Sequence, residues 1–230
     1  MMIQLFHLTK VHSSGVKVLE NAFFSVSTGA FVVVAGENRA GKSTLLKILA
    51  GEEKPTSGTV RIDQKEIYAL SVPDKQKWLS EVGFIFPDFK LFPDKTVEEN
   101  ILFPLRVRGS FEEDQKIPVA KLLERAGLAP KSGHKPSDLS SGELRMAAAL
   151  RAMVFKPRLL LADDPFLGMD EKSAHILWWL FAELNKSGTT VLVSIQKSQD
   201  LASAGDILGQ IHLEMVQLQD GQLTPVEAAP

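Results

Sequence analysis

The residues best suited to chemistry in this chain form a glycine-rich loop that ends in a lysine and two hydroxyl side chains. The loop comprises Gly36, Glu37, Asn38, Arg39, Ala40, Gly41, Lys42, Ser43 and Thr44. Such a loop lets backbone N–H groups surround phosphate oxygens at a helix N-terminus, and its lysine can reach the terminal phosphates. The Ser43 hydroxyl is an oxygen ligand of the kind that Mg²⁺ prefers. We therefore expect this phosphate loop to hold a nucleoside triphosphate.

The segments on either side of the phosphate loop agree with this interpretation. Residues 31–35 form an apolar run typical of a buried strand, and residues 45–50 form a helix-like run that Gly51 closes. A strand before the loop and a helix after it are the context that the motif requires. A glycine-rich turn with an unrelated lysine would not need these flanks.

Two adjacent carboxylates, Asp163 and Asp164, follow a second apolar run and form an acidic pair 121 residues after Lys42. Open α/β sheets place ligands at the ends of their strands. We expect Asp163 to hold Mg²⁺ directly or through water, and Asp164 to face the water that attacks the terminal phosphate. A different explanation is that the two residues are only the acidic start of the loop before Pro165. The presence of a phosphate loop in the same chain favours the metal and water roles.

A third motif, which we call the signature segment, precedes an alanine-rich helical stretch. It comprises Leu139, Ser140, Ser141, Gly142 and Glu143. The spacing of Ser140 and Glu143 is that of an ordinary helix capping box. The other interpretation is that the segment and the helix N-terminus form a second phosphate site that acts on a nucleotide held by another chain.

Length and composition agree with a cytosolic nucleotide-binding domain. It has 230 residues, of which 44% are hydrophobic, with 26 basic and 28 acidic side chains. The absence of cysteine excludes a disulfide scaffold and a thiolate metal site. A net charge of -2 predicts no nucleic-acid partner. The N-terminal residues lack the basic start and apolar core of a secretory signal, and no apolar run approaches the length of a membrane span.

Apolar periodicity predicts an α/β order that a helical insertion interrupts. Residues 2–8 and 18–26 indicate a small β layer with a turn at residues 13–15, and residues 88–155 are mainly helical. The remaining predicted elements are strands at 59–62, 82–86, 159–162 and 190–194, helices after Pro73, at 171–187 and from Ser198, and a closing hairpin over residues 211–223.

The chain resembles the ATP-binding cassette (ABC) ATPases. The phosphate loop corresponds to their Walker A motif, the signature segment to their signature, and residues 159–164 to Walker B. Residues 82–100, VGFIFPDFKLFPDKTVEEN, are most like the small subunits of the cell-division FtsE, lipoprotein-release and macrolide-export group. The resemblance implies an α/β P-loop NTPase with a mainly parallel sheet core, an N-terminal antiparallel β layer and an inserted helical subdomain. It implies a single domain over residues 1–230, with its core at about 1–87 and 156–230 and the signature subdomain at about 88–155.

The same resemblance implies ATP and Mg²⁺ as ligands and a head-to-tail dimer, homomeric or heteromeric. Each ATP would lie between one chain's Walker motifs and the other chain's signature. An integral membrane protein would dock near the segment Phe86–Phe92, where Phe86, Phe89, Leu91 and Phe92 would line a groove, and this would hold the chain at the inner face of the cell membrane. These aromatic side chains could equally fill the subdomain's own core. His12 falls where the family has an aromatic ring that stacks on adenine, although a surface histidine in a turn explains it as well.

Four positions depart from the family pattern around the reaction centre. Asp164 stands in place of the usual glutamate, Pro87 in place of the Q-loop glutamine, and Gln196 in place of the switch histidine. Ser141 replaces a glycine of the signature and adds a Cβ there. We assign catalysis to Asp164, Gln196 and Lys42. A carboxylate one methylene shorter predicts weak turnover, because a displacement of about 1 Å in a catalytic group can cost on the order of a hundredfold.

Two functions follow from these observations. The first is an ATP-binding, slowly hydrolysing subunit that couples ATP-driven dimerisation to a membrane partner. The alternative is a catalytically impaired regulatory or structural subunit that binds ATP beside an active paralogue.

Overall fold

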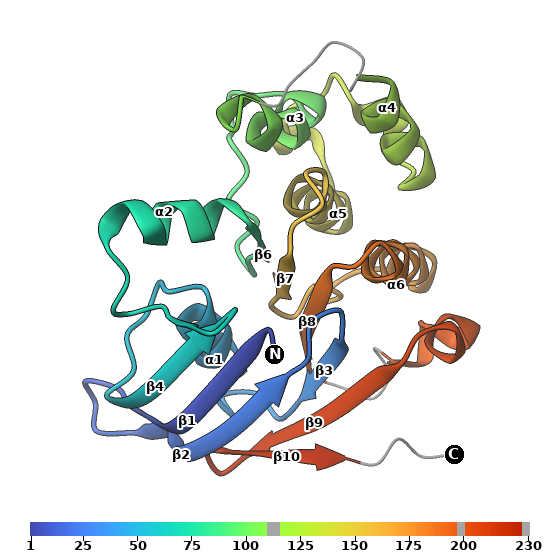
Figure 1. Cartoon of the computed structure of the whole chain (residues 1–230). Coiled ribbons are helices and arrows are strands. Elements are labelled where there is room, and N and C mark those ends of the chain that lie inside the picture. Colours follow the sequence, from blue (N-terminus) through green and yellow to red (C-terminus); the bar gives the residue numbers. More distant parts are fainter. Residues whose placement is uncertain (110–115, 197–200, 227–230) are drawn as a thin grey trace.

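Two β-sheets form the framework in the computed structural model, which describes residues 1–109, 116–196 and 201–226 (Figure 1). The larger sheet has the strand order β10-β9-β3-β8-β7-β6, and the smaller has the order β2-β1-β4-β5. The strands of the larger sheet are β3 (Phe31–Ala35), β6 (Val82–Ile85), β7 (Leu159–Ala162), β8 (Thr190–Ile195), β9 (Leu213–Gln219) and β10 (Gln222–Val226). Those of the smaller are β1 (Ile3–Val11), β2 (Lys17–Val26), β4 (Ser57–Ile62) and β5 (Lys65–Glu66).

The register of the larger sheet brings four loops to one edge. Strands β9, β3, β8, β7 and β6 run parallel, and only β10 is antiparallel to its neighbour. Ala35 pairs with Ile195, and Ala162 pairs with both Val193 and Ile85. Because these residues lie at or near the carboxyl ends of parallel strands, the loops that follow β3, β8, β7 and β6 begin side by side.

Helix α1 (Lys42–Leu49) is buried between the two sheets. Its apolar side chains pack with residues of β1 in the smaller sheet and of β3 in the larger. The packed helix residues are Leu45, Leu46, Ile48 and Leu49. This helix is apolar on most sides because sheet residues cover it from two directions, and its burial fixes the phosphate loop that leads into it.

The opposite face of the larger sheet is covered by helices. Trp178 of α6 (Glu171–Lys186) is fully buried and stacks on Phe166 with ring centroids 4.4 Å apart. Helix α5 (Ser141–Met153) packs in the same core with α3 (Val97–Val107), and α4 (Lys116–Arg125) lies beside α3 (Figure 1). The other helical elements are α2 (Val72–Ser80) and the short 3-10 turns η2 (Ala129–Lys131), η3 (Pro136–Asp138) and η4 (Gly205–Gln210).

The fold class expected from the sequence is confirmed: a mostly parallel sheet, an antiparallel N-terminal sheet and helices between β6 and β7. Element boundaries shift by a few residues. Phe86 lies beyond β6, and the helix expected to end at Ser187 ends at Lys186, with Ser187 as its C-cap. The start of the helix expected from Ser198 lies outside the described residues. No helix in the described part of the chain has the length and apolar character needed to cross a membrane.

Candidate functional site

The phosphate loop connects β3 to α1 and folds over the ammonium group of its own lysine. Lys42 is only 5% exposed, and its Nζ donates hydrogen bonds to the backbone oxygens of Gly36 (2.7 Å) and Glu37 (2.9 Å). The side chains of residues 37–39 are exposed, whereas Gly36 and Gly41 are buried. A buried cation enclosed by the backbone of a glycine-rich loop is the arrangement that phosphate binding needs.

Both glycines of the loop are required by the fold. Gly41 has a φ of 105°, and a Cβ there would lie 2.7 Å from the backbone oxygen of Val18. A Cβ on Gly36 would lie 2.7 Å from the backbone oxygen of Leu218. Gly41 is also the N-cap of α1, where no side chain caps the helix. The first N–H groups of α1 therefore lack a side-chain acceptor and can bind an anion.

His12 lies beside the start of α1. Its Nε2 is 3.4 Å from Thr44 Oγ1, and its Nδ1 is 3.7 Å from Glu53 Oε1. The imidazole ring is partly exposed. A flat ring thus stands next to the phosphate loop, as a stacking role would require, while its hydrogen bond to Thr44 also gives it a structural role.

Asp163 is fully buried at the end of β7. Its Oδ1 accepts a hydrogen bond from Ser194 Oγ at 2.9 Å, whereas Oδ2 has no hydrogen-bond partner among the described residues. A buried carboxylate oxygen without a donor is costly unless a cation or another donor reaches it. This orphaned oxygen fits a Mg²⁺ ligand, since Mg²⁺ sites commonly combine one or two carboxylates with substrate phosphates.

Asp164 is held in an uncommon backbone conformation by neighbours from β8 and the loop after it. Its φ is 43°, a left-handed value that Asp tolerates better than most residues. Its backbone N–H donates to Ser194 Oγ at 2.9 Å, and its Oδ2 accepts from Gln196 Nε2 at 2.6 Å. The structure therefore brings Asp163, Asp164 and Gln196 together, three residues that the sequence analysis assigned to one centre.

Two residues of this centre escaped the sequence analysis, Ser194 and Arg145. Ser194 is fully buried and bonded to both members of the acidic pair. Arg145 of α5 is 6% exposed, and its guanidinium donates to the backbone oxygen of Asp164 at 3.3 Å. Burial lowers the pKa of Arg145, and the negative charge of Asp164 partly offsets that effect. The sequence held one signal for each of them: Ser194 is a polar residue at the end of an apolar strand, and Arg145 is an arginine within an alanine-rich helix.

The signature segment begins α5 and lies partly exposed. Ser140 is the N-cap: its Oγ accepts from Glu143 N–H at 3.3 Å, and its own N–H donates to Glu143 Oε2 at 2.7 Å. The Ser140 N–H bond lowers the pKa of Glu143. The capping box is thus present, and Ser140 and Ser141 still face solvent, so a local role does not exclude a role toward another chain.

The aromatic segment (residues 86–92) is neither buried nor free. The Lys90 ammonium lies 3.4 Å from the centre of the Phe86 ring, and the Arg145 guanidinium lies 4.9 Å from that of Phe89. Phe92 is 37% exposed. Pro87, at the Q-loop position, is exposed and follows β6 beside the end of β7. The rings thus make contacts within the chain while staying partly exposed, and docking of a membrane protein on this segment remains a prediction.

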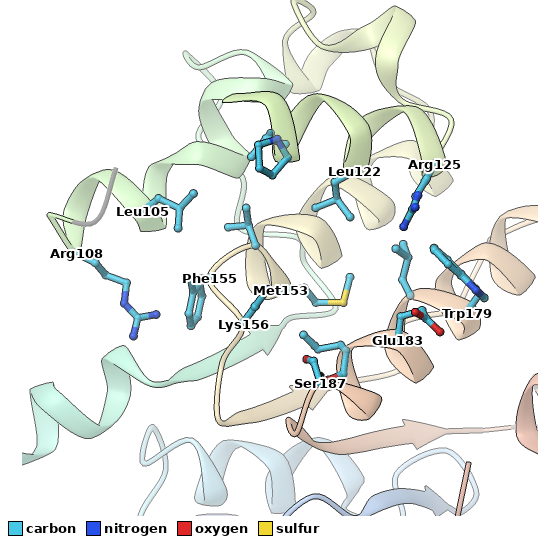
Figure 2. A pocket seen from close by; sticks show the side chains of 15 residues that line it. Leu105, Arg108, Leu122, Arg125, Met153, Phe155, Lys156, Trp179, Glu183 and Ser187 are labelled. Atoms are coloured by element: carbon cyan, nitrogen blue, oxygen red, sulfur yellow. Dashed lines mark hydrogen bonds between the residues drawn. The ribbon is translucent and has the colours of Figure 1, made fainter. Parts of the chain in front are cut away.

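A groove of about 890 Å³ lies away from the strand ends, between α4, the end of α5 and α6 (Figure 2). Its walls are largely apolar, with Leu122, Met153 and Trp179 among them, and Arg108 and Arg125 stand at its sides. None of the residues that line it belongs to the phosphate loop, the acidic pair or the signature segment. The groove is therefore separate from the candidate nucleotide site.

The fold and the site together define a phosphate-loop nucleotide-binding protein of the α/β class. Comparison with known proteins narrows this class. Residues 19–167 match the family described as ABC transporter. The lipoprotein-releasing system ATP-binding protein LolD of Pseudoalteromonas translucida (strain TAC 125) is 36% identical over 226 residues, covering 96% of this chain and 94% of LolD. The cell division ATP-binding protein FtsE of Escherichia coli (strain K12) is 32% identical, covering 96% of this chain and 97% of FtsE.

A solved structure agrees with these relatives. The ATP-binding cassette MJ0796, in a dimeric post-hydrolysis state bound to ADP and Pi, superposes with a TM-score of 0.86 at 29% identity, and each chain covers 100% of the other. The chain belongs to the ABC transporter family. Within it, the chain is an ATP-binding subunit of the type that LolD and FtsE represent, and an ATPase.

Proposed function

We propose that this chain binds Mg-ATP at the end of its parallel sheet, hydrolyses it slowly, and uses the cycle to act on a membrane partner. The observation that carries this proposal is the convergence at one sheet edge of the phosphate loop, the acidic pair and Gln196. Their strands are neighbours in the larger sheet, so a nucleotide in the loop would have its terminal phosphate directed toward the carboxylates.

Binding would rest on the phosphate loop. The uncapped N–H groups of α1 and the Lys42 ammonium would face the phosphates, and His12 would stack on the adenine ring. The phosphates would replace the two backbone oxygens that now accept from Lys42. This exchange does not leave the Lys42 ammonium without hydrogen-bond acceptors, because phosphate oxygens would take the place of the backbone oxygens.

Asp163 and Ser43 would hold Mg²⁺ together with phosphate oxygens, since the orphaned Oδ2 of Asp163 needs such a partner. When bound, the cation neutralises the charge of the phosphates. Asp164 would orient the attacking water and accept its proton, and Gln196 would hold that carboxylate in place.

Turnover is expected to be slow. Asp164 is shorter than glutamate, Pro87 offers no side-chain oxygen, and Gln196 cannot become cationic near neutral pH. The comparisons give the alternative, an impaired regulatory subunit, no support over this interpretation.

The quaternary part of the proposal rests on the relatives. LolD is named for lipoprotein release and FtsE for cell division, and the MJ0796 cassette is dimeric. We infer a second ABC subunit whose residues 140–143 complete the site, and an integral membrane protein that contacts the aromatic segment. The chain would then lie at the inner face of the cell membrane.

Phosphate release from Mg-ATP by the purified chain, measured across protein concentrations, tests the proposal. Lys42→Ala serves as the blank, and Lys47→Ala on the exposed side of the same helix as the matched control. We expect the parent chain to show slow turnover that rises more than linearly with protein concentration. Lys47→Ala should keep this turnover and Lys42→Ala should lose it. ATP binding without turnover would favour the regulatory subunit, and activity that Lys42→Ala leaves intact would refute the site.

A further inference from the structure

Arg145 occupies the boundary between the helices that follow β6 and the acidic end of β7. It projects from the first half of α5, the helix that the signature segment begins. Its guanidinium donates to the backbone oxygen of Asp164 at 3.3 Å and lies 4.9 Å from the centre of the Phe89 ring. One side chain thus contacts the carboxylate residue of the site and the aromatic segment at once.

The backbone of Asp164 needs such support. A positive φ at a residue other than glycine is strained and persists when surrounding contacts determine it. Ser194 accepts from the N–H of Asp164, Gln196 donates to its side chain, and Arg145 donates to its carbonyl. Ser194 and Gln196 belong to β8 and the residue after it, so of these three contacts only that of Arg145 comes from the helical region.

The surroundings of Arg145 are unusual for a residue whose role is only structural. Its side chain is more than nine-tenths buried, and its Nε has no hydrogen-bond partner among the described residues. Burying a cation is costly unless it is paired, and a methionine could fill the same space without that cost. A buried guanidinium at this position points to a task that its charge and its donor geometry perform.

A second arginine of α5 holds the aromatic segment and, within the described part of the chain, makes no hydrogen bond to the acidic pair. Arg151 donates to the backbone oxygens of Lys90 (2.6 Å) and Phe89 (2.9 Å). Phe89 and Lys90 also have positive φ values, 61° and 46°. Arg151 therefore offers a matched comparison, because it anchors the same segment as Arg145.

We propose that Arg145 is a positioning residue for hydrolysis. Its side chain links the aromatic segment to the backbone of Asp164, in a chain whose Q-loop position is occupied by Pro87 and not by glutamine. A shift of α5 or of Phe89 would move the guanidinium and with it the carboxylate that faces the attacking water. This inference rests on the proposed role of Asp164 and deepens it, since it assigns the connection between the segment and the reaction centre to a side chain outside the family's usual motifs.

The test compares steady-state hydrolysis and ATP binding in the parent chain, Arg145→Met, Arg145→Lys and Arg151→Met. Arg145→Met should lower kcat between about tenfold and about a hundredfold, because it displaces a catalytic group. KM and ATP affinity should stay within about twofold, because the phosphate loop is untouched. Arg145→Lys should restore part of kcat, and Arg151→Met should reduce kcat less than Arg145→Met.

An unchanged kcat in Arg145→Met would overturn the proposal. So would an equal loss in both Met variants, since the effect would then come from packing of the aromatic segment. If a thermal unfolding assay shows that Arg145→Met does not fold, the kcat values of Arg145→Lys and Arg151→Lys are compared instead, with the larger loss again expected for Arg145.

Amide hydrogen exchange separates this inference from the proposed function. Exchange at Asp164 should be faster in Arg145→Met than in the parent and in Arg151→Met, whether or not the chain hydrolyses ATP. Equal protection in all three would refute the positioning role. Absence of turnover in the parent, with faster exchange in Arg145→Met, would instead refute the assignment of hydrolysis alone.

Discussion

The phosphate loop and the acidic centre are built in opposite ways. The loop is one continuous segment whose backbone, glycines and lysine all lie within nine residues, 36–44. The acidic centre draws residues from the loop after β7 (Asp163, Asp164), from β8 and the residue after it (Ser194, Gln196) and from α5 (Arg145), and each hydrogen bond there joins different segments. The departures from the ABC pattern lie at the acidic centre, at Pro87 of the aromatic segment and in the signature segment, while the phosphate loop keeps the expected residues. In a contiguous loop, no other element lies in place to supply a functional group that is lost. In a centre built from several elements, a residue of a neighbouring element can supply it.

Removal of the Lys42 charge should give the largest effect. Lys42→Ala should weaken ATP binding by about 2 to 5 kcal/mol, the usual cost of truncating one partner of a buried, hydrogen-bonded charge pair. Titration calorimetry with Mg-ATP measures it, with Lys47→Ala as the control. An unchanged affinity of Lys42→Ala for Mg-ATP would show that the phosphate loop is not the binding region, and the contrast between a binding loop and a hydrolytic centre would fail.

Asp164→Asn should separate the two regions. The amide tolerates the left-handed backbone but cannot accept a proton, so kcat should fall between about a hundredfold and about ten-thousandfold. ATP affinity should stay within about twofold because the phosphate loop is intact. Asp206→Asn, an exposed site in η4, makes the same chemical change elsewhere. Retained turnover would show that another group acts as the base.

Ser194→Ala tests whether the acidic centre depends on its neighbours for stability. The variant leaves the N–H of Asp164 and the Oδ1 of Asp163 without their bonds to Ser194 Oγ, which should cost about 1 to 3 kcal/mol of unfolding free energy. Urea unfolding measures the change, with Ser80→Ala, an exposed serine, as the control. Equal stability of both variants would argue that the centre tolerates the loss of its bridge.

Ser140→Ala should have the smallest effect on the isolated chain, about 1 kcal/mol, which is typical of a lost N-cap. The pKa of Glu143 is lowered in the folded state, so its stabilising contribution is present above the ordinary carboxyl pKa and is lost as the pH falls. Ser140→Ala keeps the backbone N–H that lowers this pKa most and removes only the smaller contribution of the Ser140 hydroxyl, so the difference from the parent should narrow only slightly in acid, as thermal unfolding across pH would reveal. Ser141→Ala removes the neighbouring hydroxyl and keeps the cap. Equal stability of Ser140→Ala and Ser141→Ala would contradict the capping account.

Much of the framework was predictable because it depends on local patterns. The apolar run of β3 and the turn at residues 220–221 between β9 and β10 follow from alternation and turn residues. Boundaries shifted where capping decides the end, as at Ser187. Arg145 could not be assigned, because its contact with Asp164 joins residues 19 positions apart across two elements.

The sequence by itself determined the phosphate loop and the family, because a contiguous motif carries its own geometry and the order of three motifs is specific. The tertiary structure alone decided which groups hold Asp164. Ser194 and Arg145 reach it only because β8 lies beside β7 in register and α5 packs across the strand ends. Such contacts depend on how separate elements pack, and no residue spacing along the chain encodes that packing directly.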